Sequence, residues 1–114
     1  MKSGISAGSV LVLALAATFF SGATFAFDEA AAKALAKKND CTKCHAIDKE
    51  KKGPAYKKIA AKYKGKADSE QKVVKNMTVA SKVKLTDGTE EEHKVIDTKD
   101  EKEIKNIAQW ILAQ

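Results

Sequence analysis

Apolar residues recur three and four positions apart in four segments of this chain, and that period predicts four short amphipathic helices. The last segment has the clearest pattern, because aliphatic residues recur together with Trp110 over residues 104–112. The other positions that carry the pattern are Ala30, Ala31, Ala34 and Leu35 in the first segment, Tyr56, Ile59, Ala60 and Tyr63 in the second, and Val73, Val74 and Met77 in the third. The helical period therefore predicts an all-α fold.

Turn and capping residues separate these helical segments. Gly53-Pro54 breaks the chain before the second segment, and Gly65 closes it. Asp68 precedes a glutamine by three residues and Thr98 precedes a glutamate by three, which is the spacing of helix N-caps. The third helix is therefore expected to begin after Asp68 and the fourth after Thr98.

Residues 82–96, between the third and fourth helices, follow a different period. Apolar residues alternate with lysines before an Asp87-Gly88 turn, and His93 and Val95 fall on one side of the chain after it. Alternation on both sides of a turn predicts a small β-hairpin at 82–96. An exposed loop is the alternative, because a run of acidic residues follows the turn.

The first 26 residues have the composition of a secretory signal peptide. Lys2 supplies a positive charge, Val10–Phe20 is an apolar run, and Thr24-Phe25-Ala26 fits a cleavage site. The run is shorter than the roughly 20 apolar residues of a membrane-spanning helix, so cleavage after Ala26 is expected rather than retention as an anchor. The mature chain, residues 27–114, is then a single domain in the periplasm.

The mature chain is small and basic. Loss of Lys2 leaves 20 of the 21 lysines against all 15 acidic residues, a formal charge of +5. Every basic residue is a lysine, so nucleic acid is not an expected partner, because arginine normally makes the bidentate contacts to phosphates and bases. Lysines interspersed with acids indicate a solvated surface and a docking rim for an acidic partner protein. So small a core also needs additional apolar surface.

The segment Cys41-Thr42-Lys43-Cys44-His45 has the pattern that attaches a c-type haem. Two intervening residues curl the chain by about one helical turn, so both sulfurs reach one porphyrin edge and add to its vinyl groups. His45 is then the proximal ligand of the iron, and one covalent haem per chain is expected. A zinc site is disfavoured because the adjacent Cys44 and His45 would have to bind one tetrahedral ion. A thioredoxin-like dithiol lacks the surrounding βαβ pattern.

The mature chain resembles the class I c-type cytochromes, of the small bacterial monohaem electron-carrier type. The attachment motif carries the resemblance together with Leu35-Ala36-Lys37-Lys38, Gly53-Pro54-Ala55-Tyr56, Ala60-Ala61-Lys62-Tyr63 and Trp110-Ile111-Leu112. It implies about four short helices around one covalent haem, with the first and last helices crossing. It also implies that the Pro54 carbonyl accepts the proton of the second His45 ring nitrogen, which would fix the imidazole tautomer.

The chain departs from that family on the distal side of the haem. The family has a methionine there, in a proline-rich loop ahead of the tryptophan of the last helix. Pro54 is the only proline of this chain, and Met77 lies in a helical pattern 33 residues before Trp110. His93 is 17 residues before Trp110, where the family's methionine would fall. His93 is therefore the expected sixth ligand, with Met77 and an open site, occupied by water or a lysine, as alternatives.

These expectations describe a one-electron carrier that serves a donor and an acceptor protein. The sequence shows no nucleophile–base pair or oxyanion site, so the chain is not expected to be an enzyme in its own right. Two imidazole ligands should give a lower reduction potential than histidine with methionine. One alternative is a ligand-binding haem protein, a sensor or weak peroxidase, which needs a displaceable sixth ligand. Another is the cytochrome subunit of a larger oxidoreductase.

Overall fold

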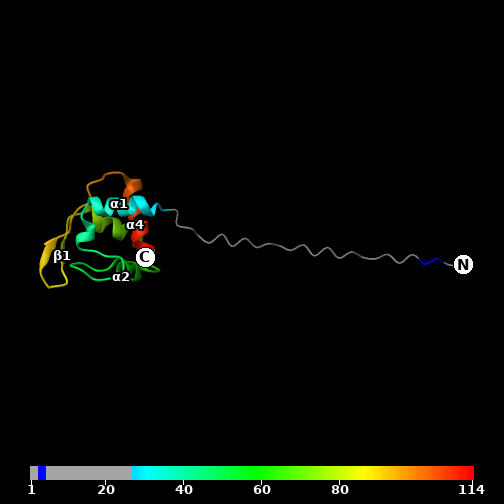
Figure 1. Cartoon of the computed structure of the whole chain (residues 1–114), viewed down its shortest axis with the longest axis horizontal. Helices are drawn as coiled ribbons and strands as arrows, with labels where there is room; N and C mark the ends of the chain where they lie inside the picture. The colour runs from blue at the N-terminus through cyan, green and yellow to red at the C-terminus, as the bar shows by residue number, and fades with distance from the viewer. Residues whose placement is uncertain (1–2, 5–26) are drawn as a thin grey trace.

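A computed structural model describes residues 3–4 and 27–114, so the predicted signal peptide and its cleavage site lie almost entirely outside the described residues. The elements of the described chain are α1 (Glu29–Lys38), the 3₁₀ helix η1 (Cys41–Lys43), α2 (Tyr56–Tyr63), α3 (Ser69–Thr78), β1 (Lys82–Lys84), β2 (Glu90–Glu92) and α4 (Glu101–Leu112) (Figure 1). The predicted helical fold with a small hairpin is confirmed. None of the helices within residues 3–4 and 27–114 has the length and apolar character to span a membrane.

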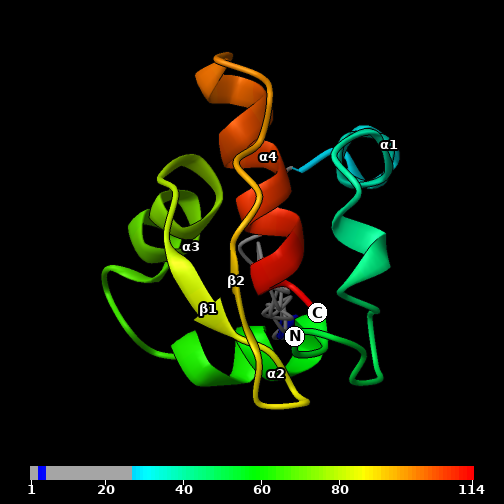
Figure 2. The ribbon, with the colours of Figure 1, turned by 90° about the vertical axis from the view of Figure 1, so that its left-hand side faces the viewer.

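Helix α4 is the centre of the fold, because α1, α2 and α3 all pack against it (Figure 2). The middle of α4 is joined to the start of α1 by a pair of hydrogen bonds. The Asp28 amide donates to Asn106 Oδ1 at 2.7 Å, and Asn106 Nδ2 donates to the Asp28 carbonyl at 2.9 Å. The carboxylate of Asp28 also caps α1 by accepting a bond from the Ala31 amide at 3.0 Å. One residue therefore starts α1 and fixes it to α4.

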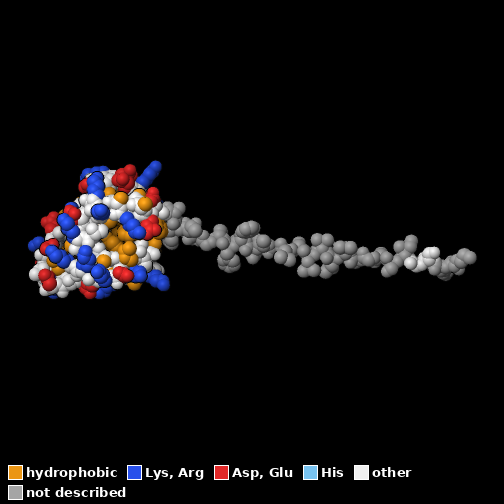
Figure 3. Space-filling model, in the orientation of Figure 1, with side chains coloured by type: hydrophobic (Ala, Val, Ile, Leu, Met, Phe, Trp, Pro, Cys, Tyr) orange, Lys and Arg blue, Asp and Glu red, His pale blue; other side chains and the backbone are white. Residues whose placement is uncertain are grey.

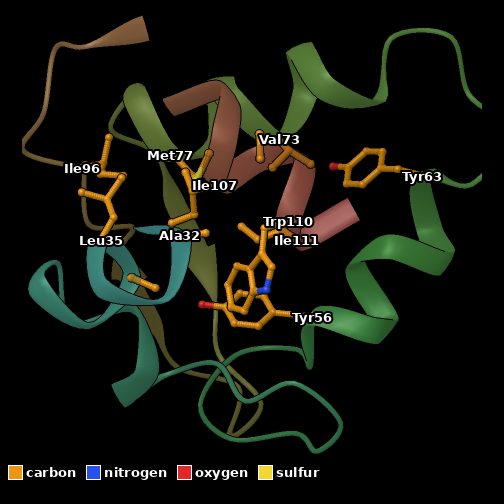
Figure 4. Packing of buried hydrophobic residues seen from close by; sticks show 12 residues of the cluster. Ala32, Leu35, Tyr56, Tyr63, Val73, Met77, Ile96, Ile107, Trp110 and Ile111 are labelled. Carbon is orange, nitrogen blue, oxygen red and sulfur yellow. The ribbon is translucent and has the colours of Figure 1, made fainter. Parts of the chain in front are cut away.

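The buried residues of the four helices form one continuous core (Figure 4). Ile107 is almost fully buried in it, and burial of such a side chain stabilises a fold by about 1.5–3 kcal/mol. In α1 the buried residues are Ala32, Leu35 and Ala36, whereas the alanines that the period singled out, Ala30, Ala31 and Ala34, are exposed. Alanine occurs on every side of this helix, so only Leu35 marks the face that packs against the core.

The predicted start of α4 at Thr98 is wrong by two residues. The N-cap is Asp100, whose carboxylate accepts a hydrogen bond from the Lys102 amide at 2.9 Å. Thr98 lies before the cap and holds the cap residue in place: its hydroxyl accepts from the Asp100 amide at 3.1 Å and donates to Glu103. Asp68 is the N-cap of α3 as predicted, but its carboxylate pairs with Lys72 at 3.0 Å and makes no capping bond to the backbone.

The hairpin is antiparallel and shorter than predicted, since β2 ends at Glu92 rather than near residue 96. Its turn is stabilised by Asp87, whose carboxylate accepts from the amide of Thr89 at 2.9 Å, and by Gly88, whose φ of +87° suits a residue without a Cβ. The expected apolar face shared by His93 and Val95 is wrong: Val95 is 39% exposed. The chain has left the strand by then, because the Ile96 amide bonds to the carbonyl of Met77 at 2.8 Å.

Candidate functional site

The two cysteines of the attachment motif lie on a single tight turn at the end of α1. Asp40 has a left-handed backbone, with φ of 58°, and this turns the chain out of α1 into η1. The amides of Cys44 and His45 then both donate to the Cys41 carbonyl, at 3.2 and 2.9 Å. This backbone arrangement holds Cys41, Cys44 and His45 within one turn, as attachment to one edge of a planar group requires.

The environment of Cys41 does not suit the attacking thiol of a redox dithiol. Its side chain is half-buried, and this burial raises the pKa of the Cys41 thiol. A reactive dithiol needs a lowered thiol pKa, because the thiolate is the nucleophile. The two cysteines are also not joined in a disulfide.

The imidazole of His45 is held in one tautomer. Its Nδ1 lies 2.6 Å from the Pro54 carbonyl oxygen, and because a carbonyl can only accept, Nδ1 carries the proton. The lone pair of Nε2 is then free to bind a metal. Burial lowers the pKa of His45, and the nearby His93 lowers it further, while the Pro54 contact opposes both. A lowered pKa favours the neutral form of His45, which is the form that a metal requires.

Gly53 allows the chain to pass close to this imidazole. Its amide donates to the Cys44 carbonyl at 2.8 Å. A Cβ at position 53 would lie 2.8 Å from His45 Cε1 and 3.3 Å from the Cys44 carbonyl oxygen. Distances this short require a shift of the ring or of the backbone, so only glycine fits here.

Gly53→Ala should destabilise the protein by about 1–3 kcal/mol, the usual cost of overpacking. It should also change the absorption spectrum and reduction potential of the haem protein, because the added methyl group displaces His45. Gly88→Ala is the matched control: it adds strain at a positive φ but has open space around the new methyl group. Denaturant unfolding and spectroscopy separate the two. A Gly53→Ala protein with the wild-type spectrum and stability would contradict the steric argument.

His93 lies immediately after β2, with its ring next to that of His45. The two ring centroids are 6.3 Å apart and the ring planes are tilted by 51°. The backbone there is fixed by the His93 amide, which donates to the Ser81 carbonyl at 2.7 Å. If each ligating nitrogen is about 2 Å from a metal between the rings, and each ring centre about 1 Å farther, the centres should be roughly 6 Å apart. At the observed spacing of 6.3 Å, both imidazoles could hold a single metal ion.

Aromatic rings and unpaired polar atoms also surround this pair of histidines. Tyr56 of α2 stacks on His45 with ring centroids 5.4 Å apart, and the edge of Trp110 of α4 meets Tyr56 at 5.2 Å. Within residues 27–114, the buried Tyr56 hydroxyl, Trp110 Nε1 and His93 Nδ1 have no hydrogen-bond partner. Buried polar atoms normally have partners, and a haem would bring carboxylates that accept from such donors. The residues present therefore fit a haem.

Met77, the alternative ligand, lies in the hydrophobic core. Its side chain is only 8% exposed and belongs to the same cluster as Val73 and Ile107. Figure 4 shows Met77 beside Ile107, with the rings of Tyr56 and Trp110 in another part of the cluster. The structure thus gives Met77 a packing role and brings His93, rather than Met77, to His45.

Two residues that the sequence analysis missed connect the attachment motif to the segment after His93. Asn39 is 3% exposed. Its side-chain Nδ2 donates to the Leu35 carbonyl at 3.0 Å, and its Oδ1 accepts from the backbone amide of Asp97 at 2.9 Å. Asp40 forms an ion pair with Lys94 at 2.9 Å, and Lys94 and Lys43 together lower the pKa of Asp40. The only local signal was the Asn-Asp pair itself, since these residues favour turns and left-handed backbone.

The chain is similar to known c-type cytochromes. The family model described as Cytochrome c matches residues 29–114. Cytochrome c-552 of Hydrogenobacter thermophilus is 31% identical over 101 residues, which are 89% of this chain and 94% of that protein. Cytochrome c-551 of Allochromatium vinosum is 42% identical over 55 residues, which span 48% of this chain and 58% of that protein. The class 1 cytochrome MtoD from Sideroxydans lithotrophicus ES-1, which has a crystal structure, is 54% identical to this chain in sequence. The match covers 77% of this chain and 97% of that chain, with a TM-score of 0.74.

Proposed function

Because this chain belongs to the class I c-type cytochromes, we propose that it is a periplasmic one-electron carrier with one haem, bound through Cys41 and Cys44 and ligated by His45 and His93. When bound, the haem supplies a one-electron iron couple. The observation that carries the proposal is the 6.3 Å separation of the two imidazole rings. An iron with protein ligands on both faces has no free position for a substrate, which favours electron transfer over chemistry on a bound molecule.

The protein's contribution is to hold the two imidazoles and tune their basicity. The Pro54 carbonyl accepts a hydrogen bond from Nδ1 of His45. This bond orients the ring and makes Nε2 a better electron-pair donor to a metal. On the other face, the bond between the His93 amide and Ser81 fixes the backbone that carries the second imidazole. Two imidazoles should give a lower potential than the histidine and methionine of other members of the family.

Spectroscopy of the exported protein tests this function directly. We expect a low-spin haem in both oxidation states, a single one-electron wave in a potentiometric titration, and slow or absent binding of carbon monoxide to the reduced protein. These results follow from two strong axial ligands. A high-spin reduced haem that binds carbon monoxide rapidly would instead favour the ligand-binding alternative, a sensor or weak peroxidase.

Export is the second part of the proposal. Residues 1–26 have the charged start, apolar run and small-residue site of a cleaved signal peptide, so the mature chain would begin at Phe27. N-terminal sequencing of the protein from a periplasmic extract should return Phe27-Asp28-Glu29. A mature chain that still begins at Met1 would contradict cleavage.

The proposed partners are redox proteins with an acidic docking surface. Lysines and acids are interspersed on the face of the domain in Figure 3. Four lysines near the attachment site in sequence, Lys43, Lys49, Lys51 and Lys52, are exposed. Two of them have contacts of their own, since Lys43 pairs with Asp40 at 3.2 Å and the Lys51 ammonium donates to the Thr42 carbonyl. Lys49 and Lys52 are therefore the better candidates for contacts with a partner.

The double variant Lys49→Gln/Lys52→Gln should slow association with an acidic redox partner several-fold at low salt. Wild-type association should also slow as ionic strength rises, because charges separated by more than roughly 8 Å are screened at physiological salt. Lys102→Gln is the control, since Lys102 is exposed at the start of α4, at the opposite end of the domain from the hairpin tip (Figure 2). Stopped-flow measurements of electron transfer give the association rates of the wild type, the double variant and Lys102→Gln. Equal rates for the two variants would contradict docking at this site.

A further inference from the structure

We propose that Thr86, at the tip of the β1–β2 hairpin, is a positioning residue that latches the hairpin to residues 51–53 and thereby keeps His93 opposite His45. This inference rests on the proposed function, because it takes His93 as the sixth ligand of the iron. On this inference the hairpin lies across the distal side of the site, opposite His45. In Figure 2 the hairpin crosses in front of α4, and its tip reaches the level of α2.

The latch consists of two hydrogen bonds from one residue. The Thr86 hydroxyl donates to the Lys51 carbonyl at 2.8 Å, and the Thr86 amide donates to the Lys52 carbonyl at 3.1 Å. Thr86 is 35 residues from Lys51 in the chain, so these bonds join two separate segments. Both carbonyls belong to the loop that leads from the attachment motif to Pro54.

This receiving loop is itself fixed to the proximal ligand. The Lys51 amide donates to the Gly53 carbonyl at 3.1 Å, and the Gly53 amide donates to the Cys44 carbonyl at 2.8 Å. His45 and Glu50 form an isolated antiparallel bridge across the same loop. The loop ends at Pro54, whose carbonyl accepts the His45 Nδ1 proton. Through Thr86, the segment that carries the distal imidazole is therefore attached to the segment that orients the proximal one.

Apart from Leu85, which is partly buried, the hairpin has little else to hold its tip in place. All residues of β2 are exposed, and in β1 only Val83 is partly buried. Neither strand packs broadly against a helix of the described chain. An isolated two-stranded hairpin is marginally stable in water, so its position depends on the bonds at its two ends. The base is held by the bond from His93 to Ser81 and by the exposed Lys94–Asp40 ion pair, and the tip is held by Thr86.

Loss of the latch should let the hairpin open more often. Segments with few apolar contacts open locally at low free-energy cost, and each opening would carry His93 away from the iron. The population of the open form rises when an interaction present only in the closed form is removed. The measurable consequence is faster exchange of His93 for an external ligand, with little change in the absorption spectrum at rest.

The variant Thr86→Val tests the latch, because valine keeps the shape of threonine and loses the hydroxyl donor. The rate of carbon monoxide binding to the reduced holoprotein, measured at saturating carbon monoxide and well below the unfolding temperature, should rise roughly fivefold, the effect of losing one hydrogen bond. Thr86→Ser keeps the donor and should restore the wild-type rate. Thr86→Ala provides a second loss of the donor should the valine variant fail to fold.

Thr89→Val is the matched control. Thr89 is in the same turn, but its hydroxyl donates to Asp87 at 2.6 Å and makes no hydrogen bond to residues 51–53. It should therefore bind carbon monoxide at the wild-type rate. Equal rates for Thr86→Val, Thr86→Ala and the wild type would overturn the latch, as would an equal acceleration in Thr89→Val.

The variant His93→Ala separates failure of the latch from failure of the proposed function. If His93→Ala becomes high-spin and binds carbon monoxide quickly while the Thr86 variants match the wild type, only the latch is wrong. If His93→Ala keeps the low-spin wild-type spectrum, the ligand assignment itself is wrong, whatever the Thr86 variants do.

Discussion

The double variant Cys41→Ala/Cys44→Ala should lose all covalently bound haem. Intact-mass analysis of the wild-type protein should give residues 27–114 plus one haem, and the variant should give the polypeptide mass alone. Any haem that remains with the variant should pass into acidified organic solvent, because no thioether bond retains it. Each single variant should keep one thioether and an intermediate stability. The physical reason is that both sulfurs lie on the one turn that η1 and its flanking bonds define.

The residues between the two cysteines provide the control for this experiment. Thr42 and Lys43 are exposed, and the motif requires only the spacing that they supply. Thr42→Ala and Lys43→Ala should therefore retain the full haem mass. A wild-type mature chain that carries two free thiols would contradict covalent attachment of the haem and would favour a redox dithiol instead.

Loss of the haem should also weaken the fold. The mature chain has 88 residues, and a domain of this size buries a small core. The buried rings of Tyr56 and Trp110 lie on the side of the core that faces the two histidines, and their polar atoms have no partners within residues 27–114. Without the haem these polar atoms would be buried and unpaired, and each such group costs about 1–3 kcal/mol. The cysteine variant should accordingly unfold at a lower denaturant concentration than the wild type.

The family and most of the fold could be predicted from the sequence, because both depend on local patterns. Leu35 and the aliphatic residues of α4 recur with the helical period, and the core contains them. Alternation around Asp87-Gly88 predicted the hairpin, which is present at Lys82–Lys84 and Glu90–Glu92. The resemblance to class I c-type cytochromes rested on the attachment motif and its context, and it is confirmed.

The errors arose where tertiary contacts decide the structure. The alternation past Glu92 suggested a longer strand, but the bond from Ile96 to the Met77 carbonyl turns the chain inward and exposes Val95. Thr98 has the spacing of an N-cap, yet Asp100 caps the helix through the Lys102 amide, while the Thr98 hydroxyl bonds to the Asp100 amide and to Glu103. Local spacing could not distinguish these outcomes, since each depends on where a distant segment or a competing polar side chain lies.

The residues of the site also divide into those that a local pattern predicts and those that depend on tertiary contacts. Cys41, Cys44 and His45 follow from one contiguous motif, whereas His93 was predicted from its distance to Trp110, the lack of a methionine–proline loop and the alternation after the turn. The contacts that support the site are more remote: Asn39 bonds to a residue 58 positions away, and Thr86 to one 35 positions away. Neither residue belongs to the attachment motif, although each lies next to a local sequence pattern. Such supporting residues become visible only when the fold brings their partners together.

Replacing His93 by alanine should convert the low-spin haem to a high-spin or water-ligated form that binds carbon monoxide readily. The imidazole of His93 lies with its centroid 6.3 Å from that of His45, and alanine leaves no donor atom at that place. His93→Met should raise the reduction potential if the thioether reaches the iron, because methionine with histidine favours the reduced state. Absorption spectra of both oxidation states and a potentiometric titration measure these effects.

Met77→Ala is the decisive comparison, since Met77 is the alternative ligand. We expect this variant to keep the low-spin spectrum and to lose about 2–5 kcal/mol of stability, as truncation of a buried methionine does. That expectation follows from its burial among Val73 and Ile107 and from its distance, within the core, from the aromatic side of the site (Figure 4). If Met77→Ala instead abolishes the low-spin spectrum while His93→Ala preserves it, the iron is ligated by the family's usual thioether from an unexpected helix. The haem would then have a higher potential than two imidazoles provide, and the hairpin would have no ligand to position.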